Sequence, residues 1–220
     1  MNGMIEDFLK KISYEINSDL PGFSAQKLMA PLGNRHPSAY LKKNECPKKS
    51  AVLVLLYPAM TGNSVKTVFI LRPENEGGSH AGQISFPGGG FDDSDADLSI
   101  TALREAEEEI GVQRNTVSLI GALTPLYIPV SNYMVHPFVG KSKKIPEFKI
   151  HPLEVQEIFE CDILELISEK NKGTILKHLK VKNEEKTVPC YKINGKIIWG
   201  ATAMIVSELS EIVKRIYPAG

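Results

Sequence analysis

Three glutamates spaced along one predicted helix could hold a divalent cation. Within residues 86–112, Glu105, Glu108 and Glu109 fall in an arc of about 100° when successive residues are placed about 100° apart around a helix axis. Carboxylates crowded on one face repel one another unless a cation neutralises them. Hard divalent cations prefer oxygen ligands and commonly lie beside substrate phosphates. Arg104 precedes Glu108 by one helical turn, so it can pair with that carboxylate and orient it.

A run of three glycines, Gly88-Gly89-Gly90, precedes this acidic helix. Glycine lets a backbone approach a ligand closely and adopt positive φ, so such a loop can wrap phosphates or hold a helix beside a metal. An acidic helix by itself is typical of a solvated surface. The glycine run together with the carboxylates favours metal and phosphate chemistry.

The helix has predicted ends and a predicted core face. Ser94 is the expected N-cap, with Asp97 in the capping-box position three residues later. Gly111 suits the left-handed residue that follows the last turn. The face opposite the carboxylates is apolar and is expected to be buried; it comprises Ile100, Leu103, Ala106 and Ile110. Glu107 falls among these apolar positions and is not counted with the other glutamates.

This stretch resembles the Nudix box, G-x5-E-x7-R-E-U-x-E-E-x-G-U, in which U is aliphatic. The matching positions are Arg104, Glu105, Ala106, Glu108, Glu109, Gly111 and Val112. The first half of the box departs from the pattern. Counted from Gly90, the box glutamate falls on Ala96; counted from Gly89, it falls on Asp95 and the spacer to Arg104 is one residue too long. The resemblance implies a Nudix fold, an α/β/α sandwich with a mixed β-sheet and a loop-helix-loop catalytic motif.

The segment before the box, FILRPENEGGSHAGQISFPGG at 69–89, resembles a second motif that marks the coenzyme A pyrophosphatase branch of Nudix enzymes. The matching residues are Arg72, His80, Gly82, Gln83, Ile84, Ser85, Phe86, Pro87, Gly88 and Gly89. Further similarity lies in SNYMVHPFVG, in HPLEVQEIF with Glu154 and Val155, and in IWGATA. Gly78 stands where the motif usually has arginine, which removes one bidentate phosphate contact.

The resemblance implies metal-dependent hydrolysis of the pyrophosphate bond in coenzyme A or its derivatives, giving 3′,5′-ADP and 4′-phosphopantetheine. Mg²⁺ or Mn²⁺ would bridge the pyrophosphate oxygens, and water activated by the metal or by a base would attack phosphorus in line. The expected catalytic residues are Arg104, Glu105, Glu108 and Glu109. Of these, Glu105 and Glu109 are the first-choice metal ligands, Glu108 is a ligand or the base, and Arg104 orients the carboxylates. The expected substrate-binding residues are Arg72, His80, Gln83, Gly88 and Gly89, and Glu154 is a candidate further acid.

Two other functions stay open from the sequence. One is a Nudix hydrolase that acts on another nucleoside diphosphate derivative, such as ADP-ribose, a nucleotide sugar or a damaged nucleotide. The other is a Nudix-like module that binds a nucleotide and regulates a partner without catalysis. The complete set of Arg104, Glu105, Glu108 and Glu109 argues against the regulator.

Composition narrows the class of protein. The chain has 220 residues, which fits a single domain at 1–220 with an N-terminal helical extension at about 1–47. Lys+Arg and Asp+Glu both number 26, so no broad surface for nucleic acid or an anionic membrane is expected. The three cysteines lack CxxC spacing, which favours a reducing compartment and a cytoplasmic location. The expected partner is a small-molecule substrate, and a homodimer is left open.

The elements that must position these residues follow from apolar patterning. It predicts helices at 4–17, 24–29, 161–168 and 201–216, and strands at 50–57, 65–72, 116–123, 133–140 and 155–160. Asp162 suits the N-cap of the third helix, and Asn194-Gly195 predicts a hairpin turn. Residues 124–132 are expected to be a loop beside the site, residues 61–63 a turn, and residues 173–188 give only a weak prediction. Strands with helices on both sides predict the same sandwich as the resemblance.

Overall fold

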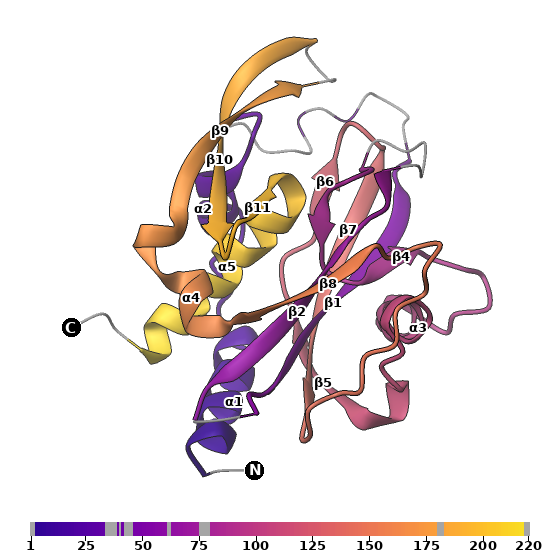
Figure 1. The fold of residues 1–220 in the computed structure, drawn as a ribbon, viewed down its shortest axis with the longest axis vertical. Coiled ribbons are helices and arrows are strands. Elements are labelled where there is room, and N and C mark those ends of the chain that lie inside the picture. The colour runs from indigo at the N-terminus through magenta and orange to yellow at the C-terminus, as the bar shows by residue number, and fades with distance from the viewer. Residues whose placement is uncertain are drawn as a thin grey trace.

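A mixed β-sheet forms the centre of the computed structural model, which describes residues 3–33, 39, 41, 46–60, 63–74, 80–179 and 183–217 (Figure 1). Within that part of the chain, eight strands join this sheet, with the order β3-β2-β1-β7-β5; β4 also pairs with β1, β6 with β7 and β8 with β2. The strands are β1 Lys48–Pro58, β2 Val65–Leu71, β3 Ile84–Ser85, β4 Gly88–Gly90, β5 Val117–Ala122, β6 Leu126–Ile128, β7 Tyr133–Ser142 and β8 Glu157–Asp162. The β1–β7 pair is parallel and the other pairs are antiparallel, so the sheet is mixed as predicted.

The continuous apolar sequence of β1 explains its central position in the sheet. A strand that is apolar on both faces is stable only when both faces are covered. Side chains alternate between the faces, so Leu53 and Leu55 pack on one side, and Val54 and Leu56 pack on the other. All four are fully buried. The predicted central strand is therefore confirmed.

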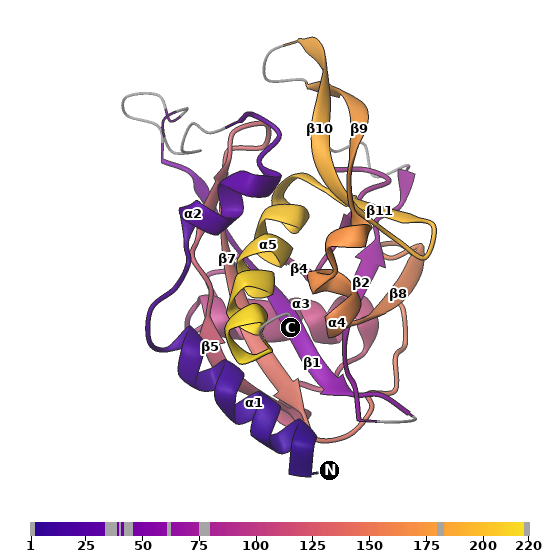
Figure 2. The ribbon, with the colours of Figure 1, turned by 90° about the vertical axis from the view of Figure 1, so that its left-hand side faces the viewer.

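Helices cover the two faces of this sheet (Figure 2). Helix α3 (Leu98–Ile110) shares a core with one face of β1 and β2. Helices α1 (Gly3–Ile16) and α5 (Gly200–Ile216) share the core of the other face. The remaining helical elements are α2 Phe23–Gln26, α4 Ile163–Ile167, and the short 3₁₀ turns η1 Lys27–Met29, η4 Arg114–Thr116 and η5 Glu169–Asn171. The predicted α/β/α sandwich is confirmed.

A second, three-stranded sheet forms from the C-terminal third of the chain. Its strands are β9 Lys172–Leu179, β10 Glu184–Ile193 and β11 Lys196–Trp199, in the order β11-β10-β9. The predicted hairpin turn between the last two strands is confirmed, since Asn194 and Gly195 both have positive φ. Residues 173–188, which the sequence predicted weakly, include most of β9 and the first half of β10.

Several predicted boundaries and capping residues can be compared with the structure. Asp162 caps α4 as expected, accepting a 2.9 Å hydrogen bond from the backbone N–H of Leu164. The loop expected at 124–132 contains the short strand β6, which pairs with β7. The turn predicted at 61–63 falls partly outside the described residues. No helix in the described ranges is long and apolar enough to cross a membrane.

Two predictions about α3 are wrong. Its N-cap is Asp97 and not Ser94, because the Asp97 carboxylate accepts hydrogen bonds from the N–H groups of Ser99 (2.8 Å) and Ile100 (3.1 Å). The Ser94 hydroxyl instead donates to Asp92, inside the turn before the helix. Ile100 was expected to be buried and is only partly so.

The face of α3 that meets the sheet explains this second error. Leu103, Ala106 and Ile110 are buried as predicted. The buried stripe is turned toward Ala102 and Glu109, which leaves Ile100 at its edge. The same rotation takes one glutamate of the expected charged face into the interior.

Candidate functional site

The Glu109 carboxylate lies at the centre of the contacts between α3 and the glycine strand β4. Glu109 is only 1% exposed. Glu109 Oε2 accepts a 2.8 Å hydrogen bond from the backbone N–H of Gly88, and Oε1 lies 3.4 Å from Nη1 of Arg72. Arg72 follows β2 and Gly88 begins β4. The Glu109 carboxylate therefore contacts both ends of the segment that connects β2 to β4.

The contacts around Glu109 do not fully compensate its charge. Burial raises the pKa of the Glu109 carboxyl to about 8, although the Gly88 N–H and the Arg72 guanidinium oppose that change. The neighbouring carboxylates of Glu105 and Glu154 raise this pKa further. Burial also raises the pKa of Glu105, and Glu108 and Glu154 add to that effect against the opposing influence of Arg104. The site therefore favours added positive charge.

Arg104 holds the other two glutamates of the helix. Its Nη1 donates to Glu105 Oε1 at 2.9 Å and to Glu108 Oε2 at 3.0 Å, which confirms the predicted pairing one turn apart. Its Nη2 donates to the carbonyl oxygen of Gly90 at 3.0 Å. The Glu108 side chain is 51% exposed whereas that of Glu105 is 15% exposed. The three predicted carboxylates therefore occupy three environments, one buried, one partly buried and one open to solvent.

The first two glycines of the run are required by close packing. Gly88 has φ of 154° and pairs with Val52 of β1, and a Cβ there would collide with the backbone of Ala51. A Cβ on Gly89 would collide with the carboxylate of Glu105. A Cβ on Gly90 would meet nothing within 4 Å. Gly88 thus brings a backbone N–H to Glu109, and Gly89 leaves room for Glu105.

Of the predicted substrate-binding residues between β2 and β3, His80 and Gln83 lie on one turn, and Arg72 is hydrogen-bonded to Gln83. Arg72 and Gln83 exchange a backbone hydrogen bond of 3.1 Å, from the Arg72 N–H to the Gln83 carbonyl. His80 Nδ1 lies 3.4 Å from Gln83 Oε1, and His80 Nε2 lies 3.1 Å from Oγ of Ser131. Sequence reasoning had left Ser131 out of the site, although SNYMVHPFVG begins with it. Gly78 lies outside the described residues.

Glu154 lies on a segment that is tied to both α3 and β2. The His151 N–H donates to the carbonyl of Glu109 at 2.9 Å, and the Gln156 N–H donates to the carbonyl of Leu71 at 2.9 Å. The Glu154 side chain is 45% exposed, and Oε1 lies 3.8 Å from His151 Nδ1. The negative charge of Glu154 makes a small contribution to the raised pKa of both Glu105 and Glu109, after the larger effect of burial.

Comparison with known proteins identifies the family. A model of the NUDIX domain matches residues 47–179 of this chain. The chain belongs to the Nudix family. An uncharacterized Nudix hydrolase named NudL from Photorhabdus laumondii is 35% identical over 136 residues, covering 62% of this chain and 71% of that protein. A NudL protein from Yersinia pestis is 35% identical over 147 residues, covering 67% of this chain and 72% of that protein.

A solved Nudix structure shares the fold. The crystal structure of a MutT/nudix family protein from Enterococcus faecalis aligns with a TM-score of 0.51 and 16% sequence identity. The alignment covers 79% of this chain and 65% of that one. At this identity the similarity concerns the fold alone. The Nudix fold expected from the box is therefore confirmed.

Asp95 occupies the position of the first box glutamate when the box is counted from Gly89. Asp95 is buried. Arg104 donates two hydrogen bonds of 3.0 Å to its carboxylate, from Nε to Oδ1 and from Nη2 to Oδ2. The Thr101 hydroxyl donates to Oδ2 at 2.8 Å. The Arg104 guanidinium lowers the pKa of Asp95 to about 2. The sequence signal for this role is the spacing of the box, which puts its first acidic position on Asp95 when it is counted from Gly89.

Nudix hydrolases generally use divalent cations such as Mg²⁺ or Mn²⁺. In the described residues, no three His, Cys, Asp or Glu side chains converge on one point, because Arg104 draws Glu105 and Glu108 while Gly88 and Arg72 hold Glu109. The donor chemistry fits a hard cation, since these ligands are carboxylate oxygens. Burial raises the pKa of both the Glu105 and the Glu109 carboxyl, so a bound cation would stabilise their ionised forms.

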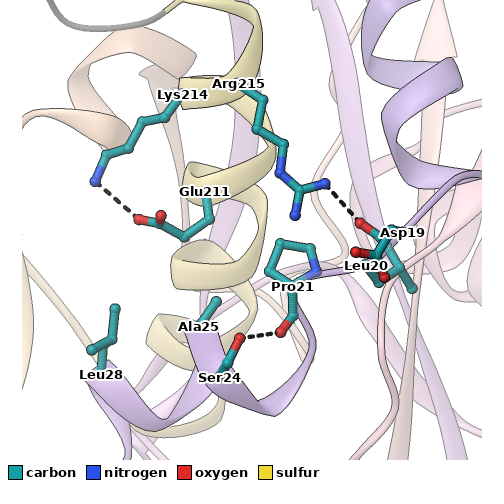
Figure 3. Close-up of a pocket in the computed structure, with 9 residues that line it drawn as sticks. All are labelled: Asp19, Leu20, Pro21, Ser24, Ala25, Leu28, Glu211, Lys214 and Arg215. Atoms are coloured by element: carbon teal, nitrogen blue, oxygen red, sulfur yellow. Dashed lines mark hydrogen bonds and ion pairs between the residues drawn. The ribbon is translucent and has the colours of Figure 1, made fainter.

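A cavity of about 480 Å³ lies away from this Nudix site, between the α1–α2 connection and α5 (Figure 3). It is lined by Asp19, Leu20, Pro21, Ser24, Ala25, Leu28, Glu211, Lys214 and Arg215. Its cations are engaged: Arg215 donates to the Asp19 carbonyl at 2.7 Å, and Lys214 donates to Glu211 at 3.0 Å. None of the described residues that line it belongs to α3 or to β4. This cavity is therefore separate from the α3 carboxylates.

Proposed function

We propose that this Nudix protein is a metal-dependent pyrophosphohydrolase that cleaves coenzyme A or its derivatives into 3′,5′-ADP and 4′-phosphopantetheine. One observation carries the proposal. Arg72 and Gly88 lie near the two ends of the coenzyme A-type motif, and both contact the carboxylate of Glu109. These contacts support the proposal that the segment resembling a coenzyme A motif and the acidic helix act together as one site.

The glutamates of α3 have distinct proposed roles. Glu105 and Glu109 would hold Mg²⁺ or Mn²⁺, because both are sheltered carboxylates with raised pKa values. A bound divalent cation would neutralise the charge that builds on the pyrophosphate oxygens as the bond breaks. Glu108, the most exposed of the three, would serve as a further ligand or as the base that takes a proton from water. Arg104 would keep Glu105 and Glu108 oriented.

The remaining site residues would bind the substrate. Arg72 carries a permanent positive charge and lies beside Glu109, so it can contact a phosphate oxygen while it holds the carboxylate. His80 and Gln83 offer polar groups on the same turn. Gly88 and Gly89 would let the backbone approach the phosphates and the cation. Glu154 is proposed as a further acid because it lies near Glu105 and Glu109.

The relatives support the general part of this proposal. The NudL proteins are named as Nudix hydrolases, and their names give no substrate. The choice of coenzyme A therefore depends on the motif residues from Arg72 to Gly89. Because Gly78 replaces the arginine of that motif, we expect a weaker preference for coenzyme A over dephospho-coenzyme A than a full motif would give.

Product identification by mass spectrometry tests this function. The purified protein is incubated with coenzyme A and either Mg²⁺ or Mn²⁺, and the expected products are 3′,5′-ADP and 4′-phosphopantetheine. Parallel reactions contain ADP-ribose, a nucleotide sugar or dephospho-coenzyme A, and a chelator control removes the metal. A much higher kcat/KM for ADP-ribose or a nucleotide sugar would overturn the substrate assignment. Binding of nucleotides without turnover of any of these compounds would favour a non-catalytic regulator.

A further inference from the structure

A second cavity, of about 450 Å³, lies beside the Nudix site. Its described lining residues are Pro73, Glu74, Ile150, Pro152, Val155 and Gln156. They come from two segments, the chain that leaves β2 and the chain that leads into β8. The volume falls in the range typical of small-molecule sites, about 300–1,000 Å³.

Backbone hydrogen bonds fix both walls of this cavity to the elements that carry the site. One wall continues directly from Arg72, which contacts Glu109. The other wall is held at both ends, through the His151 N–H to the Glu109 carbonyl and the Gln156 N–H to the Leu71 carbonyl. Both walls of the cavity are therefore attached to the elements that carry Arg72 and Glu109.

The lining indicates which part of a substrate fits. Four of the described lining residues, Pro73, Ile150, Pro152 and Val155, are apolar, and Gln156 adds an amide that can donate and accept. No lysine or arginine is found among the described residues that line the cavity. Glu74 also lines it. A carboxylate and the lack of a cation among these described lining residues disfavour a phosphate or a phosphorylated ribose inside the cavity.

We propose that this cavity is the subsite for the uncharged pantetheine arm of the substrate. The inference rests on the proposed coenzyme A hydrolysis and specifies how its two halves are arranged. The pantetheine arm carries apolar methyl and methylene groups together with two amides, which match apolar walls and the Gln156 side chain. The 3′-phosphorylated adenosine half would lie away from this lining, on the other side of the pyrophosphate.

Two matched substitutions test the subsite. Ile150 lines the cavity and is 40% exposed, so Ile150→Trp can fill the space without disturbing a core. Leu153 lies on the same segment, is 80% exposed and is not among the lining residues, so Leu153→Trp is the control. Ile150→Ala is a second cavity variant that adds no bulk. Thermal unfolding of each variant establishes that it folds.

The readouts are the KM for coenzyme A and competitive inhibition by each product. Ile150→Trp is expected to raise the KM for coenzyme A and the inhibition constant of 4′-phosphopantetheine by about tenfold, which is a loss of about 1.4 kcal/mol in binding. The inhibition constant of 3′,5′-ADP should stay within about twofold. Ile150→Ala should produce a smaller change of the same kind, and Leu153→Trp should match wild type.

Each contrary outcome has a separate meaning. A selective rise in the inhibition constant of 3′,5′-ADP would assign the cavity to the adenosine half and overturn the inference. Unchanged constants in folded Ile150→Trp would show that the substrate does not enter the cavity, and would also overturn it. In both cases wild-type turnover of coenzyme A would leave the proposed function intact. A wild-type protein that does not hydrolyse coenzyme A would instead refute the proposed function, together with the subsite that depends on it.

Discussion

Glu109 and Glu208 are both buried glutamates on helices, yet their surroundings differ. Glu208 on α5 is fully buried and accepts hydrogen bonds from the Gly22 N–H (3.2 Å), the Gln26 side-chain amide (2.9 Å), and both the N–H (3.2 Å) and the hydroxyl (2.6 Å) of Thr124. Glu109 on α3 has one N–H donor at 2.8 Å and a guanidinium at 3.4 Å.

This difference supports a structural role for Glu208 and the ligand-binding role proposed for Glu109. The donors around Glu208 come from the N-terminal segment and the chain after β5, so this glutamate joins distant parts of the fold. Around Glu109, neighbouring carboxylates raise the pKa, and the contacts present do not offset burial. Both carboxylate oxygens of Glu208 thus accept hydrogen bonds from several donors, whereas the contacts of Glu109 offset its burial only in part.

The largest expected effect comes from removing a carboxylate of the α3 site. Glu109→Gln and Glu105→Gln should each lower turnover by about 1,000-fold, because cation positioning is lost while the shape of the side chain is kept. Initial rates with saturating Mn²⁺ measure turnover, and thermal unfolding measures whether the variants keep the stability of wild type. Near wild-type rates in both variants would exclude these residues as metal ligands.

Removing the other buried glutamate should have the reverse pattern. Glu208→Ala leaves the donors of Gln26 and Thr124 without their acceptor, so the free energy of unfolding should fall by about 3 kcal/mol. The rate measured well below the unfolding temperature should stay within about threefold. Urea denaturation of Glu208→Ala and of Glu109→Gln compares their free energies of unfolding. A stable but inactive Glu208→Ala would contradict the structural role.

A smaller effect is expected from the glycine run. Gly89→Ala would push its Cβ into the Glu105 carboxylate, which must then turn aside, so turnover should fall by about tenfold. Its free energy of unfolding should change by no more than about 1 kcal/mol, because the displaced group is the end of a side chain. Gly90→Ala is the matched control and should retain activity, since its Cβ would meet nothing within 4 Å. Equal rates in the two variants would argue against a role for Glu105.

The last prediction concerns pH in the absence of metal. The pKa of Glu109 is raised from 4.5 to about 8 in the folded protein, so folding favours its protonated form. The contribution of this group to stability is fully present below pH 4.5 and is lost as the pH rises through 8. Unfolding temperatures of the chelated protein between pH 5 and 9 should therefore fall less steeply for Glu109→Gln than for wild type. The same slope in both proteins would mean that another group titrates.

The sequence by itself determined the features that depend on neighbouring residues. The continuous apolar run gave the central strand, and the spacing of Arg104 and Glu108 gave their ion pair. Asp162 and Asn194-Gly195 were identified because a helix cap and a tight hairpin turn require particular side chains or positive φ. These interactions span at most a few residues, so a single segment encodes them.

Only the tertiary structure decided which glutamate is buried and what surrounds it. The rotation of α3 against the sheet placed Glu109 inside and Ile100 at the edge, and it depends on how Ala102 and Ala106 pack against β1 and β2. The partners of Glu208 and the walls of the cavity at Ile150 come from segments that are distant along the chain. Such contacts form only after the elements pack, and helical periodicity alone cannot fix which side of a charged helix meets a sheet.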